Sequence, residues 1–419
     1  MIRIILCSTL LFGGTFLLSA QEPELTTQAE IVSFAQKVEK TNIAVLPFTL
    51  KGTKTLSKNL PWAVVAHDLG FTDKFVIFKK KMVDSVGFAL DNVSLYVTGE
   101  YEVVGDTAII SFRLMELGVD IPMIFGREYR VAVTDIRSAA HDFSNSIVEQ
   151  LLGSKGAFDS QILFVRKGVD GKNIYLADYD GKRARKLTQS GINIMPTFGK
   201  KGHYYFVSYL RGKPDIYEGS FTHSSQQIRL YSRRVEASPN YCPATKQVVY
   251  SSSRGGNMDI YIANADGTNK RQLTVSGGID AAPSLSPNGY FIAFISDRSG
   301  TPQVYVMDKF GGNLKRITYA SRYYDSPTWS PDGKQIAFTT RVDGQYRIGI
   351  AQYPSGDETV ITAEEPGSHR YPSWSPDGNH IAFTRSGGGY SDIFAITVDT
   401  RRVTQLTNYG NAETVSWSE

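Results

Sequence analysis

The stretch that decides the fold is "PTWSPDGKQIAFTT" at residues 327–340, which recurs almost unchanged as "PSWSPDGNHIAFTR" at residues 372–385. Three looser copies precede these two, and the prolines that open the five copies are spaced 43, 44, 44 and 45 residues apart. The five are Pro196, Pro239, Pro283, Pro327 and Pro372. A partial sixth copy, "TVSWSE", places Trp417 where the quoted copies have Trp329 and Trp374. A period of this length indicates an array of similar structural units.

A second repeated element alternates with the first. It reads, for example, "DIYIAN" and "QVYVMD", and a Leu-Thr or Ile-Thr pair follows most copies. Each period then holds about four short strands separated by Gly, Asp and Asn turns, which is typical of a β-propeller blade. The strands are continuously apolar, as in residues 336–338, which fits strands covered on both faces by neighbouring blades.

Counting strands predicts how the ring closes. Residues 161–188 contain three strands of a blade and lack the first, and the stretch ending at Trp417 supplies the missing one. We therefore expect six blades in residues 158–419, closed by pairing of both ends of the repeat region, which leaves no open sheet edge.

Residues 21–153 do not repeat and predict an N-terminal α/β domain. They contain an apolar strand at residues 42–50, a helix around 62–69, a hairpin that turns at Gly105-Asp106, and a closing helix. Thr134 and Gly153 are the expected N-cap and C-cap of that helix. The predicted fold class is therefore α+β, an N-terminal α/β domain followed by a six-bladed β-propeller, whose repeats resemble the WD40-like PD40 repeat.

The first twenty residues have the layout of a cleaved signal peptide, with Arg3, an apolar run, and small residues before Gln21. We therefore expect an exported protein. Of the two cysteines, Cys7 lies in this segment, so Cys242 is left without an internal partner and is expected to be buried. The net charge of +4 is small, and the basic run at residues 182–186 fits a solvated turn, so no nucleic-acid partner is expected.

The repeated acids Asp332 and Asp377 are the first candidates for chemistry, as metal ligands or as turn residues. Ser-Pro-Asp-Gly is a type I turn sequence, and Asn288 replaces the acid in one copy, which favours the turn. The six histidines show no metal-ligand spacing, and no Gly-x-Ser-x-Gly pentapeptide is present. We expect no catalytic residue, no metal site and no cofactor.

Binding surface is predicted where the loops before the aligned prolines ring one mouth of the axial channel. Tyr and Arg side chains in such loops are typical interface anchors. The alternative is that the tyrosines only cap the channel. The predicted partner-binding residues are Asp280, Tyr323, Tyr324, Asp325, His369, Arg370, Tyr371 and Glu413.

A family resemblance covers essentially the whole chain after the signal peptide. The order of "IAVLPF", "HDLGFTDKF" and "IRSAAHDFSNSIVEQLLGSKGAFDSQILFV" ahead of Ser-Pro-Asp-Gly repeats resembles the TolB family, a periplasmic component of the Tol-Pal system. The resemblance implies a non-enzymatic adaptor in envelope integrity and cell division. It implies a Pal-like lipoprotein at the propeller mouth and a TolA-like inner-membrane protein on the N-terminal arm, with binding at the two places coupled. The arm residues concerned are Glu30, Ile31, Val32 and Phe34.

Two departures from the family pattern stand out. "TFGKKG" and "NYCPAT" replace the turn motif in the first two copies, and the arm is longer than the usual start. We expect a monomer that reaches membranes only through its partners. The alternatives are a regulatory propeller of an envelope peptidase, a metal-dependent lyase, or a scaffold for another envelope protein.

Overall fold

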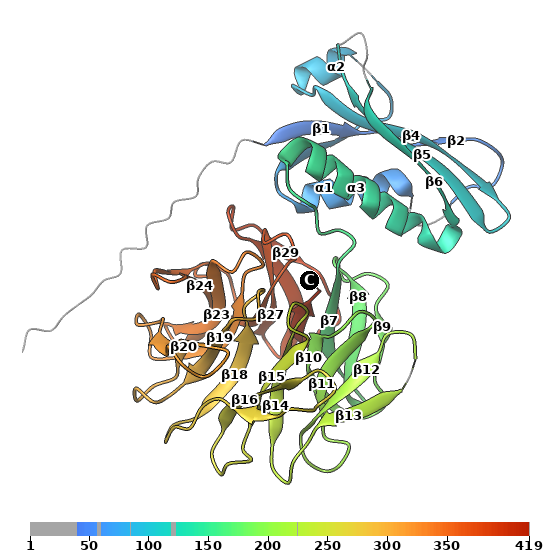
Figure 1. The fold of residues 1–419 in the computed structure, drawn as a ribbon. Coiled ribbons are helices and arrows are strands. Elements are labelled where there is room, and N and C mark those ends of the chain that lie inside the picture. The colour runs from blue at the N-terminus through green and yellow to red at the C-terminus, as the bar shows by residue number, and fades with distance from the viewer. Residues whose placement is uncertain (1–39, 57–59, 84, 119–122, 224, 419) are drawn as a thin grey trace, which may run out of the picture. The chain divides into compact units, whose positions relative to one another are not determined.

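The structure is a computed structural model that describes residues 40–419 except 57–59, 84, 119–122, 224 and 419, and Figure 1 shows its elements. The predicted signal peptide and the arm residues Glu30, Ile31, Val32 and Phe34 lie outside the described residues.

The N-terminal part is a mixed sheet with the strand order β3-β1-β4-β5-β6, and β2 lies beside β4. Strand β1 is parallel to both of its neighbours, whereas β4, β5 and β6 form an antiparallel meander. The elements are β1 (Thr41–Val45), β2 (Thr49–Leu50), α1 (Pro61–Phe71), β3 (Phe75–Lys79), α2 (Ser85–Leu90), β4 (Leu95–Val104), β5 (Thr107–Glu116), β6 (Met123–Ala132), the 3-10 turn η1 (Val133–Asp135) and α3 (Ile136–Leu152). The predicted α/β character of this region is confirmed.

Both faces of this sheet are covered. Side chains alternate along β1, so Ile43 and Val45 join the apolar cluster of α1 and α3, while Ala44 joins that of α2 on the other face. Helices α1 and α3 pack side by side (Figure 1).

The two ends of α3 test the predicted caps. Gly153 takes the left-handed conformation, with φ 70°, and its N–H donates to the carbonyl of Glu149 at 3.0 Å, as a C-cap does. The expectation for Thr134 is wrong. This residue lies inside η1, the N-cap position is Asp135, and no side chain caps the helix, because the chain enters α3 through a 3-10 turn.

The rest of the chain is a β-propeller whose sheets stand around a common centre (Figure 1). Four separate sheets have four strands each, β14–β17, β18–β21, β22–β25 and β26–β29, and a further sheet has eight strands in the order β13-β12-β11-β10-β8-β7-β30, with β9 beside β8. Only two parallel residue pairs join β8 to β10. The strands are β7 (Gln161–Gly168), β8 (Gly171–Asp178), β9 (Arg185–Lys186), β10 (Gly191–Phe198), β11 (His203–Ser208), β12 (Asp215–Ser220), β13 (Gln226–Leu230), β14 (Glu236–Cys242), β15 (Gln247–Ser252), β16 (Asp259–Asn264), β17 (Arg271–Gln272), β18 (Asp280–Leu285), β19 (Phe291–Ser296), β20 (Gln303–Asp308), β21 (Lys315–Arg316), β22 (Tyr324–Trp329), β23 (Gln335–Val342), β24 (Gln345–Gln352), β25 (Glu358–Val360), β26 (Ser368–Trp374), β27 (His380–Gly387), β28 (Tyr390–Thr397), β29 (Val403–Gln405) and β30 (Ala412–Trp417).

The two ends of the repeat region pair as predicted. Strand β30 is antiparallel to β7, with Trp417 opposite Ile162 and Ala412 opposite Arg166. Strand β30 supplies backbone hydrogen-bond partners that β7 would otherwise lack. The last strand of the chain thus completes the sheet that begins with β7 and β8.

The repeated Leu-Thr and Ile-Thr pairs have a common structural role. In five sheets the threonine hydroxyl accepts a hydrogen bond from the backbone N–H of the third strand, each at 2.9 Å. The threonines are Thr188, Thr274, Thr318, Thr362 and Thr407. The hydroxyl replaces a backbone acceptor where the short outer strand ends, so a buried N–H does not lose its partner.

The Ser-Pro-Asp-Gly sequences form turns, as predicted. Asp332 accepts hydrogen bonds from the Ser330 hydroxyl at 2.6 Å and from the N–H of Lys334 at 3.0 Å. Asn288 accepts the equivalent pair at 2.7 and 3.0 Å in its own turn. Gly333 has φ 70°, a conformation that costs glycine little. The acids are therefore turn residues.

The N-terminal helices contact the hairpin that follows β8 through buried charges. The Arg137 guanidinium donates from Nε to Asp178 at 2.8 Å and from Nη2 to Asp180 at 2.6 Å. Beside them, the Tyr179 hydroxyl donates to Asp68 at 2.8 Å. All of these side chains are at least nine-tenths buried, so the charges are compensated by one another and not by water.

Candidate functional site

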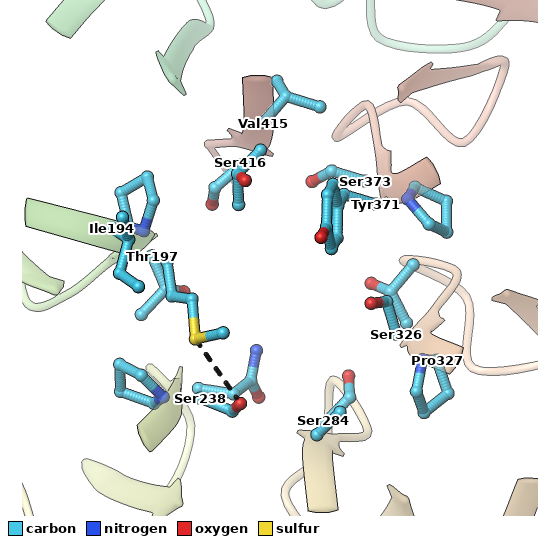
Figure 2. A pocket seen from close by; sticks show the side chains of 18 of the residues that line it. Ile194, Thr197, Ser238, Ser284, Ser326, Pro327, Tyr371, Ser373, Val415 and Ser416 are labelled. Atoms are coloured by element: carbon cyan, nitrogen blue, oxygen red, sulfur yellow. Dashed lines mark hydrogen bonds between the residues drawn. The ribbon is translucent and has the colours of Figure 1, made fainter. Parts of the chain in front are cut away.

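The candidate site is a cavity of about 280 Å³ at the centre of the propeller, where the innermost strands β10, β14, β18, β22, β26 and β30 meet. In Figure 2 the labelled side chains from these strands are arranged as a ring around an open centre. The lining is rich in hydroxyl and amide groups, from Thr197, Ser238, Asn240, Ser284, Ser326, Thr328, Tyr371, Ser373, Thr414 and Ser416.

One local irregularity recurs in every innermost strand and shapes the wall. The residue before each aligned proline, and Thr414 before Val415, has a positive φ between 50° and 58°. These residues are Met195, Ser238, Ala282, Ser326, Tyr371 and Thr414. The pairing with the second strand shifts register at the same place in all six strands, so each strand carries a β-bulge there.

Left-handed backbone at a non-glycine residue costs about 1–3 kcal/mol and persists only where the surroundings enforce it. Here a hydroxyl of the preceding sheet supports three of the six residues. Tyr371 donates its N–H to Thr339 at 3.2 Å, Ala282 to Ser251 at 3.1 Å and Thr414 to Thr384 at 2.9 Å.

In the sheet β22–β25 a different side chain bonds the N–H of the left-handed residue. Ile295 stands where Thr339 stands one repeat later and offers no hydroxyl, and the N–H of Ser326 bonds the carboxylate of Asp325 at 2.7 Å instead. Burial raises the pKa of Asp325, because its carboxylate has little contact with water.

Three of the eight predicted partner-binding residues are buried and do not line the cavity. Asp280, Tyr324 and His369 all stand two residues before the left-handed position and have at most 1% of their surface exposed. Their polar groups are used internally. Asp280 accepts two bonds from Arg298, at 2.8 and 2.9 Å, and the Tyr324 hydroxyl donates to Glu358.

His369 is held in one neutral form. Its Nε2 bonds the carbonyl of Pro366 at 3.0 Å, so this nitrogen carries the proton, and Nδ1 accepts from the Thr362 hydroxyl at 2.9 Å. Burial lowers the pKa of His369 to about 4, assisted by the nearby positive charges of Arg347 and Arg385. The imidazole accepts the hydrogen bond of the Thr362 hydroxyl. The Asp392 carboxylate has the same role for the Thr407 hydroxyl one repeat later.

Three further predicted residues form a half-buried cluster around Tyr346. Arg370 lies over the Tyr346 ring with its guanidinium carbon 3.4 Å from the centroid, and Tyr323 packs edge-on to the same ring at 5.4 Å. The Tyr323 hydroxyl donates to Asp325 at 3.4 Å, and burial raises the pKa of Tyr323 to about 12. None of the three is part of the cavity lining.

The remaining two predicted residues, Tyr371 and Glu413, do line the cavity. Glu413 of β30 forms an ion pair with Lys172 of β8, which also lines it. These two supply the charges of the lining, and they neutralise each other, so most of the wall presents neutral hydrogen-bonding groups. Such a wall can bind a polar segment of a partner without demanding a charge from it.

Sequence reasoning missed the small lining residues, among them Ser238, Ala282, Ser326 and Ser373. These residues could have been found from the sequence, because they stand at fixed positions just before or just after the aligned prolines. The sequence prediction favoured large and charged residues, and six of the eight that it named do not line the cavity.

Three further observations concern the described residues as a whole. Cys242 is buried in β14, as expected. Among the residues that the structure describes, no group of three or more His, Cys, Asp or Glu side chains could hold a metal ion. In the same part of the chain, no helix is long and apolar enough to cross a membrane.

Comparison with known proteins agrees with this architecture. The PD40 family, described as the TolB beta propeller domain, matches residues 148–419. A Tol-Pal system protein TolB from Desulfosudis oleivorans is 32% identical over 165 residues, 39% of this chain and 37% of that protein. A protein TolB homolog from Chlorobium chlorochromatii is 29% identical over 219 residues, 48% of this chain and 49% of that protein. The chain thus spans half or less of the curated relatives' length in these matches.

A solved structure is similar over a longer part of the chain. The crystal structure of TolB from Acinetobacter baumannii superposes with a TM-score of 0.80 over 90% of this chain and 96% of that one, at 23% identity. The fold and the repeated bulged strands around a central cavity define a β-propeller with an N-terminal α/β domain. Since the family match covers residues 148–419, the chain belongs to the PD40 family of TolB β-propeller domains.

Proposed function

We propose that this chain is a non-enzymatic periplasmic adaptor of the Tol-Pal system, which binds a Pal-like lipoprotein at the central cavity of the propeller. The observation that carries the proposal is the cavity wall, in which six bulged strands contribute hydroxyl and amide side chains around one open centre. The relatives named as Tol-Pal system proteins support the choice of system. A preformed wall of this kind suits recognition because little conformational freedom is lost on binding.

The two proposed partners bind different parts of the chain. Residues 21–153 form the domain that carries the TolA-binding arm, and residues 158–419 form a propeller of six blades, obtained by dividing the eight-stranded sheet where two residue pairs join β8 to β10. The arm residues Glu30, Ile31, Val32 and Phe34 are the proposed contacts of a TolA-like protein. Deletion of residues 21–39 should abolish TolA-like binding and spare Pal-like binding.

The contact set at the cavity is narrower than the sequence suggested. Tyr371 and Glu413 are the proposed direct contacts, together with Ser238 and Ser326. Tyr323, Asp325 and Arg370 would support the rim. Asp280, Tyr324 and His369 would act only by holding the strands, because their side chains are buried.

The test is direct binding of a purified Pal-like lipoprotein, without its lipid, to the exported chain. Tyr371→Ala should weaken binding about tenfold or more, which is the effect expected of losing a tyrosine that is a binding hot spot. Tyr290→Ala is the matched control, because Tyr290 is 43% exposed and does not line the cavity. Equal loss with both variants, or none with Tyr371→Ala, would remove the cavity from the proposal.

A further inference from the structure

A second surface stands out by its charge. Residues 199–258 contain nine lysines and arginines but only three acids, Asp215, Glu218 and Glu236. All three acids are at most 4% exposed. They pair with cations of the same stretch, Asp215 with Lys213, Glu218 with Arg229, and Glu236 with Arg254 at 3.6 Å. The three acids are therefore buried and paired, and they add no exposed negative charge to this surface.

Three cations contact one exposed tyrosine, Tyr231. Tyr231, in the loop from β13 to β14, is 50% exposed, and Arg211 and Lys270 lie 5.6 and 5.3 Å from its ring centroid. Its carbonyl accepts a bond from Arg254 at 3.2 Å, and this contact joins the turn after β15 to the loop. Cation–π contacts of this kind orient the ring and keep the guanidinium near it.

Two more exposed arginines and one apolar side chain complete the surface. Arg233 and Arg234 follow Tyr231 in the same loop, and Leu210, which is 70% exposed, precedes Arg211. We define the Tyr231 patch as Leu210, Arg211, Tyr231, Arg233, Arg234 and Arg254. None of the six lines the central cavity.

We propose that the Tyr231 patch binds an acidic polypeptide segment of a partner protein. Four of its six side chains are guanidinium groups, whose planar fork matches carboxylates in pairs of parallel hydrogen bonds. The same chain shows this geometry internally, since Arg183 donates from Nε and from Nη2 to the two oxygens of Asp178, at 2.8 and 3.0 Å. Tyrosine beside arginine is the composition of an interface anchor.

A protein segment fits the patch better than a lipid surface does. Leu210 is its single aliphatic side chain, and insertion into a bilayer interface draws on a larger apolar face. The surface does not depend on the proposed role of the central cavity, so either proposal can fail without the other.

The experiment uses a fluorescein-labelled oligoglutamate peptide and an oligoglutamine peptide of equal length, with fluorescence anisotropy as the readout. The full chain should bind the glutamate peptide saturably, bind the glutamine peptide far less, and lose affinity as salt rises from about 50 to about 300 mM. Arg233→Glu with Arg234→Glu should weaken binding about tenfold or more, and Tyr231→Ala should weaken it about threefold or more, at the lower salt.

The matched control is Arg185→Glu with Arg322→Glu, two exposed arginines outside the patch that change the net charge equally. The control should keep its affinity within about twofold, since it leaves the patch intact. Thermal unfolding verifies that every variant is folded. Equal loss in test and control variants would show attraction to overall charge and overturn the proposal. Binding to phosphatidylglycerol vesicles that is lost with the patch variant, without peptide binding, would overturn it as well.

Discussion

Trp417 donates a hydrogen bond from its indole Nε1 to the hydroxyl of Ser160 at 2.8 Å, across 257 residues of sequence. The indole also lies near Phe71 of α1, with ring centroids 6.5 Å apart. Trp329 and Trp374 instead donate to backbone carbonyls of the preceding innermost strand, those of Ser284 and Thr328. The closing copy of the repeat thus contacts the segment that leads into the propeller.

Trp417→Ala should destabilise the chain by about 3–5 kcal/mol, because it empties a buried site as well as removing the bond. Trp417→Phe retains most of the volume and should cost about 1 kcal/mol from the bond itself. Urea unfolding measures both values. A double-mutant cycle with Ser160→Ala isolates the bond, and a coupling near zero would contradict its contribution.

The left-handed position of each innermost strand predicts an unusual response to glycine. Ala282 has φ 50°, so Ala282→Gly should leave stability unchanged or raise it by up to about 1 kcal/mol, whereas Ala282→Val should cost about 2 kcal/mol. Ala281 is the control, because it precedes the bulge at an ordinary extended position. There glycine should destabilise by about 0.5–1 kcal/mol. Equal effects of glycine at both positions, measured by urea unfolding, would contradict strain at Ala282.

Thr362 tests the hydroxyl that completes the outer strand. Thr362→Val leaves the buried N–H of Ile348 without its acceptor and should cost about 1–3 kcal/mol, whereas Thr362→Ser should retain most of the stability. Thr359→Val is the control, because Thr359 is exposed in the neighbouring β25. Thermal unfolding ranks the three variants. A valine at position 362 as stable as the serine would show that the hydroxyl contributes nothing.

His369 should make stability depend on pH. Its pKa falls from 6.5 to about 4 in the folded chain because of burial, so the unfolded chain takes up the proton first as the pH falls. The contribution of His369 is therefore fully present above about pH 6.5, declines through the interval below it, and levels off below about pH 4.

The measurement is the urea midpoint at a series of pH values. His369→Gln should remove this part of the decline, and His223→Gln, at an exposed histidine, should leave it in place. Other groups titrate in the same interval, so the informative quantity is the difference between each variant and the unchanged chain. An identical difference for both variants would contradict the role of His369.

Much of the architecture was readable because the repeat is an internal alignment. The spacing of the prolines located five innermost strands, and the copy at Trp417 located the sixth. The missing first strand predicted the pairing of β30 with β7. Asn288, which takes the place of Asp332 in another copy, identified the acids as turn residues. Local chemistry was enough for these inferences, since a turn sequence and an apolar run specify nearly the same structure in each copy.

The cavity wall could not be read in the same way. Strict alternation would place Tyr324 or His369 on the same face of its strand as the residue two positions later. The bulge instead inserts a left-handed residue and reverses the faces beyond it. Whether Asp325 or a hydroxyl such as Thr339 supports that residue depends on the neighbouring sheet, far away in the sequence.

The sequence by itself determined the repeat, the order of the strands and the chemistry of each turn, because these depend on residues close together in the chain. The tertiary structure alone decided which side chains face the cavity and which exposed arginines surround Tyr231. Those choices arise where separate sheets meet, and they depend on hydrogen bonds and burial between residues that the chain brings together only on folding.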